Sequence, residues 1–353
     1  MAAWLVLQGG PRRLSVRGGA LLVEQQGEPV RALRPEDVEE VHAFGDVELT
    51  CAARRLLLRH GIDVVFHTRD GRVQGRLTSA ASRAGERRLA QLGCVLDPAR
   101  RMPVARAIVA GKIRNQHIGL GRIQRQVRSE GLADALATLR AMASAAGGAT
   151  DLERLMGIEG YASRVYFGVL GQGLRNPLFS FTGRNRRPPR DPVNAVLSFL
   201  YTLLCQRTEH AARGAGLDPY VGFLHEAGRG RAACAFDLAE AWRPVVDALV
   251  LGLFNRRQLS PEDFEDPGVD LTRVSETPGE DPEPVDPAAR PVYLGPVGRS
   301  VVLTAWARRL QERAWSVERE ARFPLEDLMR IEAQALARAA AEPVPAYQPY
   351  AWR

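Results

Sequence analysis

The sequence predicts an α+β protein in which a small N-terminal β domain precedes a larger all-α domain. Up to about residue 80, short apolar or alternating runs are separated by glycines, which is the pattern of short strands and turns. After Ala80, nearly every segment repeats its apolar residues with the 3.6-residue period of an amphipathic helix. A chain of 353 residues is long enough for two domains with their own cores, which we place at residues 1–85 and 86–353.

The strands expected in the first domain are short and follow one another closely. They correspond to the runs WLVLQ, RLSVRG, ALLVEQ, PVRAL, EEVHAF, DVVFHT and RVQGRL. Gly18-Gly19 and Asp70-Gly71 have the composition of tight turns between strands. One helix is expected at about 48–60. The apolar start, MAAWLVL, lacks a basic leader and a cleavage site, so we expect it to form the first strand.

The second domain is expected to contain long amphipathic helices. They span residues 83–97, 104–128, 131–143, 151–170, 192–214, 234–255, 299–320 and 325–341. Pro244 cannot donate a hydrogen bond to the carbonyl of Glu240, so the helix is expected to bend or restart there. Residues 261–290 are rich in proline and acidic residues and are predicted to form a mobile loop.

The charge balance indicates an anionic partner. The formal net charge is +7, but residues 261–286 hold ten acidic residues against one basic residue. That segment has a net charge of −9, which leaves about +16 on the rest of the chain. Such a field attracts nucleic acid, although an anionic membrane or simple solubility fits the same composition.

Cysteine usage and hydropathy indicate a cytoplasmic protein that does not cross a membrane. No stretch approaches the roughly 20 apolar residues that span a bilayer, and even VVDALVLGLF carries Asp247. The cysteines form no CxxC pair, which argues against a zinc ribbon or a disulfide scaffold. They are Cys51, Cys94, Cys205 and Cys234.

The most informative stretch runs from Gly222 to Asn255. His225 precedes a helical segment in which Asp237, Glu240 and Arg243 are spaced by three residues and so share a helix face. A solvated face with a weak surface ion pair is the ordinary explanation. The apolar neighbours of these acids favour a different explanation, in which the acids are buried and a cation keeps them ionised. The nearby imidazole indicates that this cation is a metal. These neighbours are Phe236, Leu238, Ala239 and Trp242.

A further acid, Glu159, lies in similar surroundings within a predicted helix upstream. Thr150 and Glu153 fit a capping box at the start of that helix. Gly157 and Gly160 flank the acid, and each costs about 1 kcal/mol relative to alanine inside a helix. We therefore expect another backbone or a ligand to approach closely there. A tight helix crossing with an incidental glutamate is the alternative.

Ordered blocks of this chain resemble the motifs of one family. EGYASRVYF surrounds Glu159, and RRPPRDPVNAVLSFLYTLL runs from Arg186 to Leu204. GFLH is followed by GR, by DLAEAWRP and by Asn255-Arg256. Together they resemble the CRISPR-associated integrase family, the first-numbered Cas proteins, which form the catalytic subunit of the spacer-acquisition complex. The likeness covers nearly the whole chain and implies a β-sandwich-like N-terminal domain followed by an all-α catalytic domain.

The resemblance also implies a metal site. The family's metal ligands fall on Glu159, His225 and Glu240, and Asp237 falls on a neighbouring acid that supports the site, so these four are the expected catalytic residues. Two carboxylates and one imidazole with open positions suit Mg²⁺ or Mn²⁺ better than a closed zinc cage. The zinc-protease motif is excluded, because HEAGR has Arg229 where that motif needs its second histidine.

Basic residues on several elements are candidates for holding DNA. The segment KIRNQ, from residue 112, resembles the family's KIxNQ helix. The loop GRNRRPPR at 183–190 sets arginines among prolines on stiff backbone that suits phosphate contacts. A solvated helix face and loop solubility are the alternatives. The DNA-binding candidates are Lys112, Arg114, Arg184, Arg186, Arg187 and Arg243.

The function that the resemblance implies is a metal-dependent DNA endonuclease and integrase. It would insert short DNA fragments, called spacers, into a CRISPR repeat array by transesterification at phosphodiester bonds. The implied partners are double-stranded DNA (captured fragment and repeat array), a second copy that forms a homodimer through residues 1–85, and the small second Cas protein of the acquisition complex. No membrane partner is expected. A catalytically idle DNA-binding scaffold of the same fold and a branched-DNA nuclease are the alternatives.

Overall fold

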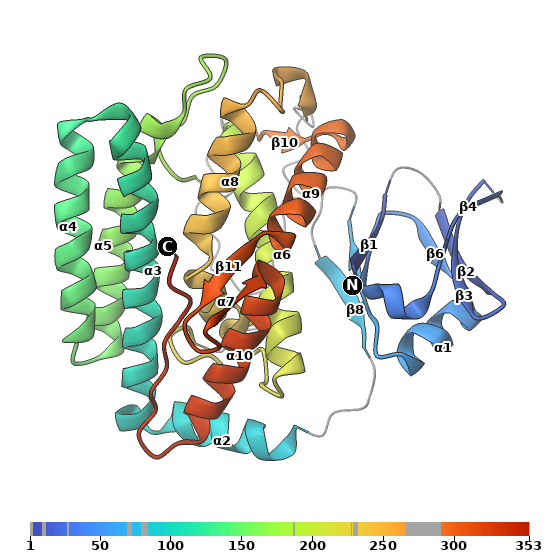
Figure 1. Cartoon of the computed structure of the whole chain (residues 1–353), viewed down its shortest axis with the longest axis horizontal. Coiled ribbons are helices and arrows are strands. Elements are labelled where there is room, and N and C mark those ends of the chain that lie inside the picture. The colour runs from blue at the N-terminus through green and yellow to red at the C-terminus, as the bar shows by residue number, and fades with distance from the viewer. Residues whose placement is uncertain are drawn as a thin grey trace. The chain divides into compact units, whose positions relative to one another are not determined.

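The computed structural model (Figure 1) describes residues 3–8, 12–26, 28–68, 73–78, 84–185, 188–226, 228, 232–265 and 291–352. The chain divides into two compact units, Met1–Arg83 and Ala84–Arg353. The predicted Asp70-Gly71 turn and residues 266–290 of the predicted acidic loop lie outside the described residues.

The N-terminal unit contains two four-stranded sheets and the helix α1, so the predicted β-sandwich-like architecture is confirmed. One sheet has the strand order β1-β5-β7-β8 and the other β4-β3-β2-β6. In the first sheet β1, β5 and β7 are parallel and β8 is antiparallel. The bounds are β1 (Ala3–Leu7), β2 (Arg12–Arg17), β3 (Ala20–Gln25), β4 (Glu28–Leu33), β5 (Val38–Phe44), β6 (Val47–Leu49), α1 (Cys51–Arg59), β7 (Asp63–His67) and β8 (Val73–Leu77).

One apolar core joins the two sheets and α1. Leu14 and Leu21 come from one sheet, Val41 and Val64 from the other, and Leu57 from the helix, and none has exposed surface. Side chains alternate between the two faces of a strand, so the two-residue period of the sequence places these residues on the inner faces. Burial of each such side chain stabilises the unit by about 1.5–3 kcal/mol.

The C-terminal unit is built from helices α2 to α10. Helices α3, α4 and α5 pack side by side, and α10 packs against α2 and α6 (Figure 1). Within the described part of the chain, no helix combines the length and the apolar character needed to cross a membrane. The bounds are α2 (Gly85–Leu96), α3 (Pro98–Val127), α4 (Glu130–Gly147), α5 (Leu152–Leu170), α6 (Pro192–Gly214), α7 (Ala233–Glu240), α8 (Arg243–Asn255), α9 (Pro296–Gln311) and α10 (Leu325–Ala341).

The helix expected over 234–255 is interrupted, as the proline predicts. Helix α7 ends at Glu240, and α8 begins at Arg243 with Pro244 in its first turn, where a missing N–H costs nothing. Glu240 therefore stands at a helix end. The start of α5 differs in detail from the prediction, because Asp151 and not Thr150 is the residue that caps it, accepting from the Arg154 N–H.

The prediction of a helix over 299–320 is wrong at its C-terminal end. Helix α9 stops at Gln311, and a hairpin of β11 (Arg313–Ser316) and β12 (Ala321–Pro324) follows. Exposed and less exposed residues alternate along both strands, and Pro324 disfavours a helical conformation in the residue before it. A second short pair joins β9 (Phe264–Glu265) to β10 (Tyr293–Leu294), so the helical unit also contains strands.

The C-terminal tail is fastened along α3 by one buried amide. Asn115 Nδ2 donates to the carbonyls of Tyr350 (2.8 Å) and Ala241 (2.7 Å), and Asn115 Oδ1 accepts from Trp352 N–H at 2.9 Å. A Cβ at Gly111 would lie 2.3 Å from Pro349 Cγ, so glycine is required for this approach. The amide thus ties the tail, α3 and the residue after α7 into one assembly.

A buried acid on α8 gives the helical unit a pH-dependent stability. Asp247 accepts hydrogen bonds from the hydroxyls of Tyr166 (2.8 Å) and Tyr201. Burial raises the pKa of Asp247 to about 6 from an ordinary value of 3.8, although both hydrogen bonds act in the opposite direction. Because the pKa of Asp247 is higher in the folded state than in the unfolded state, its ionisation destabilises the fold. The free energy of unfolding is therefore highest below about pH 4 and falls as the pH rises to about 6.

Replacing Asp247 by asparagine is expected to stabilise the protein at pH 8 by about 3 kcal/mol, at 1.36 kcal/mol for each pKa unit. The amide removes the buried charge and keeps both contacts, since its oxygen accepts from one tyrosine and its nitrogen donates to the other. Urea unfolding at pH 5 and pH 8 measures the gain, which should shrink to roughly half at pH 5. A gain that does not change with pH would contradict this explanation.

Candidate metal-binding active site

Side chains from three helices meet around the ammonium group of Lys112. Lys112 lies on α3, Glu159 on α5, and Glu240 is the last residue of α7. The Lys112 ammonium donates to Glu159 Oε1 and lies 2.6 Å from Glu240 Oε2. The lysine is 5% exposed. Two acids that are far apart in the sequence therefore face the same buried cation.

Both carboxylates are held in their ionised form. Glu240 Oε1 also forms an ion pair with Arg243 Nη2 at 3.0 Å. Burial raises the pKa of the Glu240 carboxyl, but the charges of Arg243 and Lys112 outweigh it and lower the pKa to about 2. Burial acts on Glu159 in the same way, and the Lys112 charge nevertheless holds its pKa below the usual range. Ser163 Oγ donates a further hydrogen bond to Glu159 Oε1 at 3.0 Å.

His225 is oriented by Asp237. Asp237 Oδ1 accepts from His225 Nδ1 at 2.7 Å and from the His225 N–H at 3.1 Å, while Oδ2 accepts from the N–H groups of Phe223 and Leu224. An ionised carboxylate has no proton to give, so Nδ1 must carry the proton, and Nε2 of a neutral ring is left with its lone pair. The charge of a protonated His225 lowers the pKa of Glu240, which places the imidazole in the same neighbourhood.

These donors fit a hard divalent ion in their chemistry. Two ionised carboxylates and one imidazole with an available Nε2 are ligands of Mg²⁺ and Mn²⁺. The buried Glu240 Oε2 has the Lys112 ammonium as its partner, at 2.6 Å. Within the described residues, the ligand atoms of Glu159, His225 and Glu240 do not all lie within 4.8 Å of one another. The ammonium of Lys112 stands between the two carboxylates.

The helix face beside Glu159 is open. A Cβ added to Gly157 or Gly160 would meet no atom within 4 Å, so no neighbouring backbone approaches these glycines and the alternative of a tight helix crossing is wrong. Met156 and Tyr161 on the same stretch are 38% and 48% exposed. Of the two explanations for the glycines, the approach of a ligand is the one left open.

The DNA-binding candidates have different surroundings in the structure. Arg114 is exposed on α3. Lys112 and Arg243 are instead inside the site, because the carboxylates of Glu159 and Glu240 pair with them. Arg184 donates to Asn194 Oδ1 (2.8 Å) and to Ser198 Oγ (3.0 Å), which ties its loop to α6. Arg186 and Arg187 lie outside the described residues.

Several residues of the site were missed in the sequence analysis. The burial of Lys112 could have been predicted from the helical period. Lys112, Asn115 and Gln116 fall on one face of α3, and all three are buried. Trp242 stacks on Tyr350 with ring centroids 3.9 Å apart, and its indole N–H donates to the buried Glu332. No local pattern predicts these contacts, because Glu332 and Tyr350 come from distant segments.

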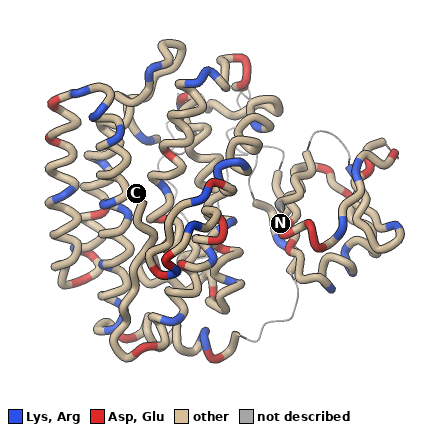
Figure 2. Tube along the Cα trace, viewed as in Figure 1, with Lys and Arg blue, Asp and Glu red and all other residues tan. Residues whose placement is uncertain are grey.

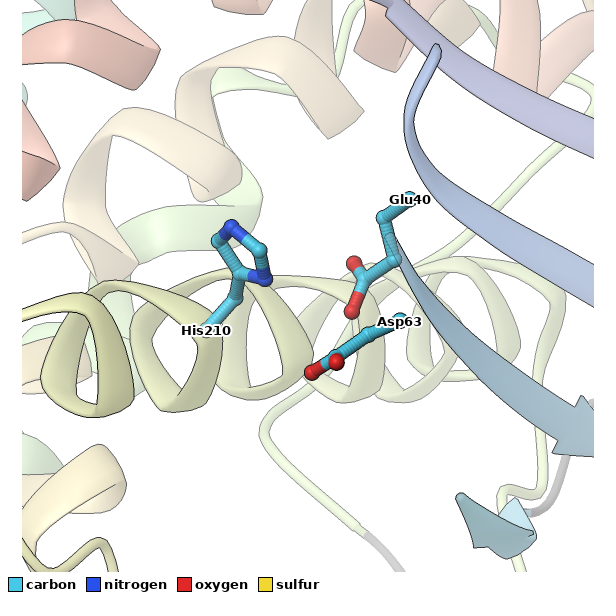
Figure 3. A group of neighbouring side chains, drawn as sticks. All are labelled: Glu40, Asp63 and His210. Carbon is cyan, nitrogen blue, oxygen red and sulfur yellow. The ribbon is translucent and has the colours of Figure 1, made fainter. Parts of the chain in front are cut away.

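Acidic side chains also stand together in the N-terminal unit. Glu40 and Asp63 are neighbours in register on β5 and β7, and Figure 3 shows their carboxylates side by side. Arg76 Nη1 lies 2.6 Å from Glu40 Oε1 and 3.3 Å from Asp63 Oδ2. His210, also drawn in Figure 3, belongs to α6 of the helical unit and is not counted in this pair. One guanidinium serves both acids, so we assign them to the packing of the sheet.

Replacing Asp237 by asparagine is expected to destabilise the protein by about 2–6 kcal/mol. Each Asp237 oxygen accepts from two donors, so whichever oxygen becomes an NH₂ group leaves two donors without an acceptor, at about 1–3 kcal/mol each. Urea unfolding measures the loss. Asp218→Asn is the matched control, because Asp218 Oδ1 accepts only the Tyr220 N–H from its own loop and an amide oxygen can keep that bond. Equal losses in both variants would contradict the assignment.

Comparisons with known proteins show what the chain is similar to. A sequence model of the family described as CRISPR associated protein Cas1 matches residues 5–274. The chain is 38% identical over 357 residues to CRISPR-associated endonuclease Cas1 1 of Thermus thermophilus, covering 100% of each chain. It is 36% identical over 327 residues to CRISPR-associated endonuclease Cas1 2 of Rhodospirillum rubrum, covering 90% of this chain and 88% of that one. The solved Cas6-RT-Cas1--Cas2 complex contains a chain with a TM-score of 0.80 and 25% identity, covering 99% of this chain and 36% of that larger one.

Proposed function

Because the chain belongs to the Cas1 family of CRISPR-associated proteins, we propose that it is a metal-dependent DNA endonuclease and integrase that joins short DNA fragments into a repeat array. Relatives named CRISPR-associated endonuclease support the endonuclease class. One structural observation carries the proposal further. Glu159 and Glu240, from separate helices, converge on a single buried cation, and His225 offers an oriented Nε2 in their neighbourhood.

In the proposed active site, Glu159, Glu240 and His225 Nε2 would hold Mg²⁺ or Mn²⁺, which would supply Lewis-acid stabilisation of the charge that develops at the scissile phosphodiester. Asp237 fixes the tautomer and the orientation of His225 and is therefore a positioning residue. Arg243 keeps Glu240 ionised. Lys112 has to leave its place between the two carboxylates when they bind the ion.

The proposed reaction exchanges one phosphodiester bond for another. A DNA 3′-hydroxyl attacks the phosphorus, a new P–O bond forms and the bond to the 3′ oxygen of the cut strand breaks. The attacking hydroxyl loses its proton to solvent, and the departing 3′ oxygen takes up a proton from solvent and leaves as a 3′-hydroxyl. When water replaces the 3′-hydroxyl, the same site hydrolyses the strand. The nucleophile is supplied by the DNA or by water, so the reaction needs no protein nucleophile. The number of phosphodiester bonds is conserved in strand transfer, so the reaction needs no separate energy source.

We further propose that basic residues outside the cation cluster hold the DNA. Arg114 is exposed on α3, and Arg184 provides positive charge next to α6. Arg186 and Arg187 are proposed from the sequence of the same loop. Such contacts bind phosphates without reading sequence. The proposed assembly contains a homodimer through residues 1–85, the captured and target double-stranded DNA, and the small second Cas protein. The similar Cas1 chain in the Cas6-RT-Cas1--Cas2 complex supports that partner.

A strand-transfer assay tests this function. Purified protein is incubated with a supercoiled repeat plasmid, a labelled short duplex, Mn²⁺ and the second Cas protein, and covalent transfer of the label to the plasmid is measured on a denaturing gel. We expect transfer with 3′-hydroxyl ends, none with 3′-dideoxy ends and none in EDTA. Label transfer that ignores the 3′ end would contradict the mechanism. Plasmid nicking without transfer, or cleavage of branched DNA alone, would assign the site to a nuclease.

A further inference from the structure

Lys112 is the only lysine of the chain. Lysine and arginine together number 48, so every other basic residue, and every other blue position in Figure 2, is an arginine. Arginine presents a wide, planar guanidinium, whereas lysine carries a compact charge on a flexible four-carbon chain. A compact charge that can change its position suits a place between two carboxylates that also bind a metal ion. The use of lysine at this single position therefore fits an ammonium group that moves.

A buried acceptor without a donor lies one helical turn away from Lys112. Gln116 is 2% exposed, and no donor in the described part of the chain reaches its Oε1 atom. Residues four apart on a helix are neighbours, with Cβ atoms about 5–6 Å apart, and a helical side chain leans toward the N-terminus of its helix. The Gln116 amide therefore leans toward Lys112. A buried acceptor without a donor costs stability, which points to a donor that arrives in another state of the protein.

Contacts between α3 and α5 show which way this amide faces. Lys112 pairs with Glu159, and seven residues further along both helices a Cβ at Gly119 would lie 3.8 Å from the Tyr166 hydroxyl. The two helices therefore run in the same direction. Gln116 lies between these two contacts on the same face of α3, so its buried amide faces α5, as the ammonium does. A move of the ammonium to this amide would stay within the contact between the two helices.

We propose that Gln116 Oε1 accepts the Lys112 ammonium when a divalent ion takes the place of the ammonium between Glu159 and Glu240. The ammonium then has a partner in both states, the two carboxylates without the ion and the amide with it. A buried cation without a partner is strongly unfavourable, so the amide makes binding of the ion less costly. Gln116 touches neither the ion nor DNA in this role and is a positioning residue. The role rests on the proposed function, because only an ion held by the carboxylates would displace the ammonium.

Mn²⁺ binding in the absence of DNA tests this role by a double-mutant cycle. Free Mn²⁺ is measured by electron paramagnetic resonance for the wild type, Gln116→Met, Lys112→Met and the double variant. Gln116→Met should bind Mn²⁺ about 10- to 150-fold more weakly than the wild type, the range for loss of a hydrogen bond to a charged group. In the Lys112→Met background the same change should alter the affinity by less than about twofold, because no ammonium needs an acceptor there.

Urea unfolding in EDTA separates this effect from a folding defect. Gln116→Met removes an acceptor that has no donor and keeps the size of the side chain, so its unfolding midpoint should equal or exceed that of the wild type. Gln91→Met is the matched control, because the buried Gln91 amide donates to the carbonyls of Asp218 (3.0 Å) and Val221 (2.7 Å). Its midpoint should fall and its Mn²⁺ affinity should stay unchanged. An equal fall for Gln116→Met would overturn the proposal, since the amide would then have a partner without the ion.

The single lysine allows a direct observation that does not depend on the folding of Lys112→Met. Protein labelled with ¹⁵N- and ¹³C-lysine gives one side-chain ammonium signal. Saturating Mg²⁺ should move this signal in the wild type and keep its protons protected from exchange with water. In Gln116→Met with Mg²⁺, the same protons should exchange too fast to be seen. A signal that Mg²⁺ does not move would overturn the proposal, because the ammonium would then stay between the carboxylates.

The binding results separate the role of Gln116 from the proposed metal site. Equal Mn²⁺ affinities of the wild type and Gln116→Met would overturn the proposal and assign a bound water to the amide. Equal weakening with and without Lys112 would also overturn it, because Gln116 would then act on the ion itself. No Mn²⁺ binding by either the wild type or Lys112→Met would overturn the proposed metal chemistry together with this role, whereas binding that ignores Gln116 would overturn this role alone.

Discussion

Glu159→Gln, Glu240→Gln and His225→Ala are each expected to lower the rate of strand transfer by more than about 100-fold. Loss of a residue that merely orients a metal ligand costs 10- to 100-fold, so loss of a ligand should cost at least that much. Glutamine keeps the shape and polarity of the side chain, and urea unfolding of Glu159→Gln and Glu240→Gln separates a chemical defect from a folding defect. The rate is measured with saturating DNA and Mn²⁺ on denaturing gels.

The same variants should bind duplex DNA almost as the wild type does, because that affinity comes from phosphate contacts spread over the basic surface. Arg114→Ala is the complementary control, since Arg114 is exposed on the helix that carries Lys112. It should weaken DNA binding and make the affinity less sensitive to salt. The rate at saturating DNA should be unchanged. Near-normal strand transfer by any of the three ligand variants would remove that residue from the site, and normal transfer by all three would remove the proposed metal chemistry.

Local physical rules were enough for much of the fold. The two-residue period of the first domain gave its strands, and Pro244 predicted the break that leaves Glu240 at a helix end. The hairpin that follows α9 was missed, because its charged residues also fit a helical pattern over a short stretch. Strand pairing between Trp315 and Arg322 decided the outcome there, and a pairing of this kind is a tertiary contact that a single short segment does not reveal.

The residue types of the candidate site could be predicted from the sequence. The buried lysine between its two carboxylates could not. Glu159, His225, Asp237 and Glu240 stand out as acids and an imidazole in apolar segments, and the family resemblance selects them. The position of Lys112 depends on two carboxylates that come from helices far away in the sequence. A lysine in a run of basic residues is most simply assigned to an exposed face, and only the packing of α3 against α5 and α7 brings it inside.

Removing the internal cation is expected to couple folding to metal binding. In Lys112→Met, the partly buried carboxylate of Glu159 and the buried carboxylate of Glu240 would retain Arg243 alone as a charged partner in the cluster. Breaking a buried ion pair by deleting one partner costs about 3–5 kcal/mol, so the variant should be destabilised by about that amount in EDTA. A divalent ion can replace the missing positive charge. At a concentration 100 times its Kd it should restore about 2.7 kcal/mol.

Thermal unfolding of Lys112→Met and of the wild type, each with EDTA and with a series of Mn²⁺ concentrations, measures this coupling without any DNA. Arg114→Met is the matched control, because it also removes one positive charge from α3, but from an exposed position, where surface pairs contribute at most about 1 kcal/mol. The Mn²⁺-induced rise in Tm should be larger in Lys112→Met than in the wild type, since the ion no longer has to displace an ammonium group from between the carboxylates. If Lys112→Met is as stable as Arg114→Met in EDTA, or gains no more from Mn²⁺ than the wild type does, the ammonium does not occupy the position of the metal and the two carboxylates need another explanation.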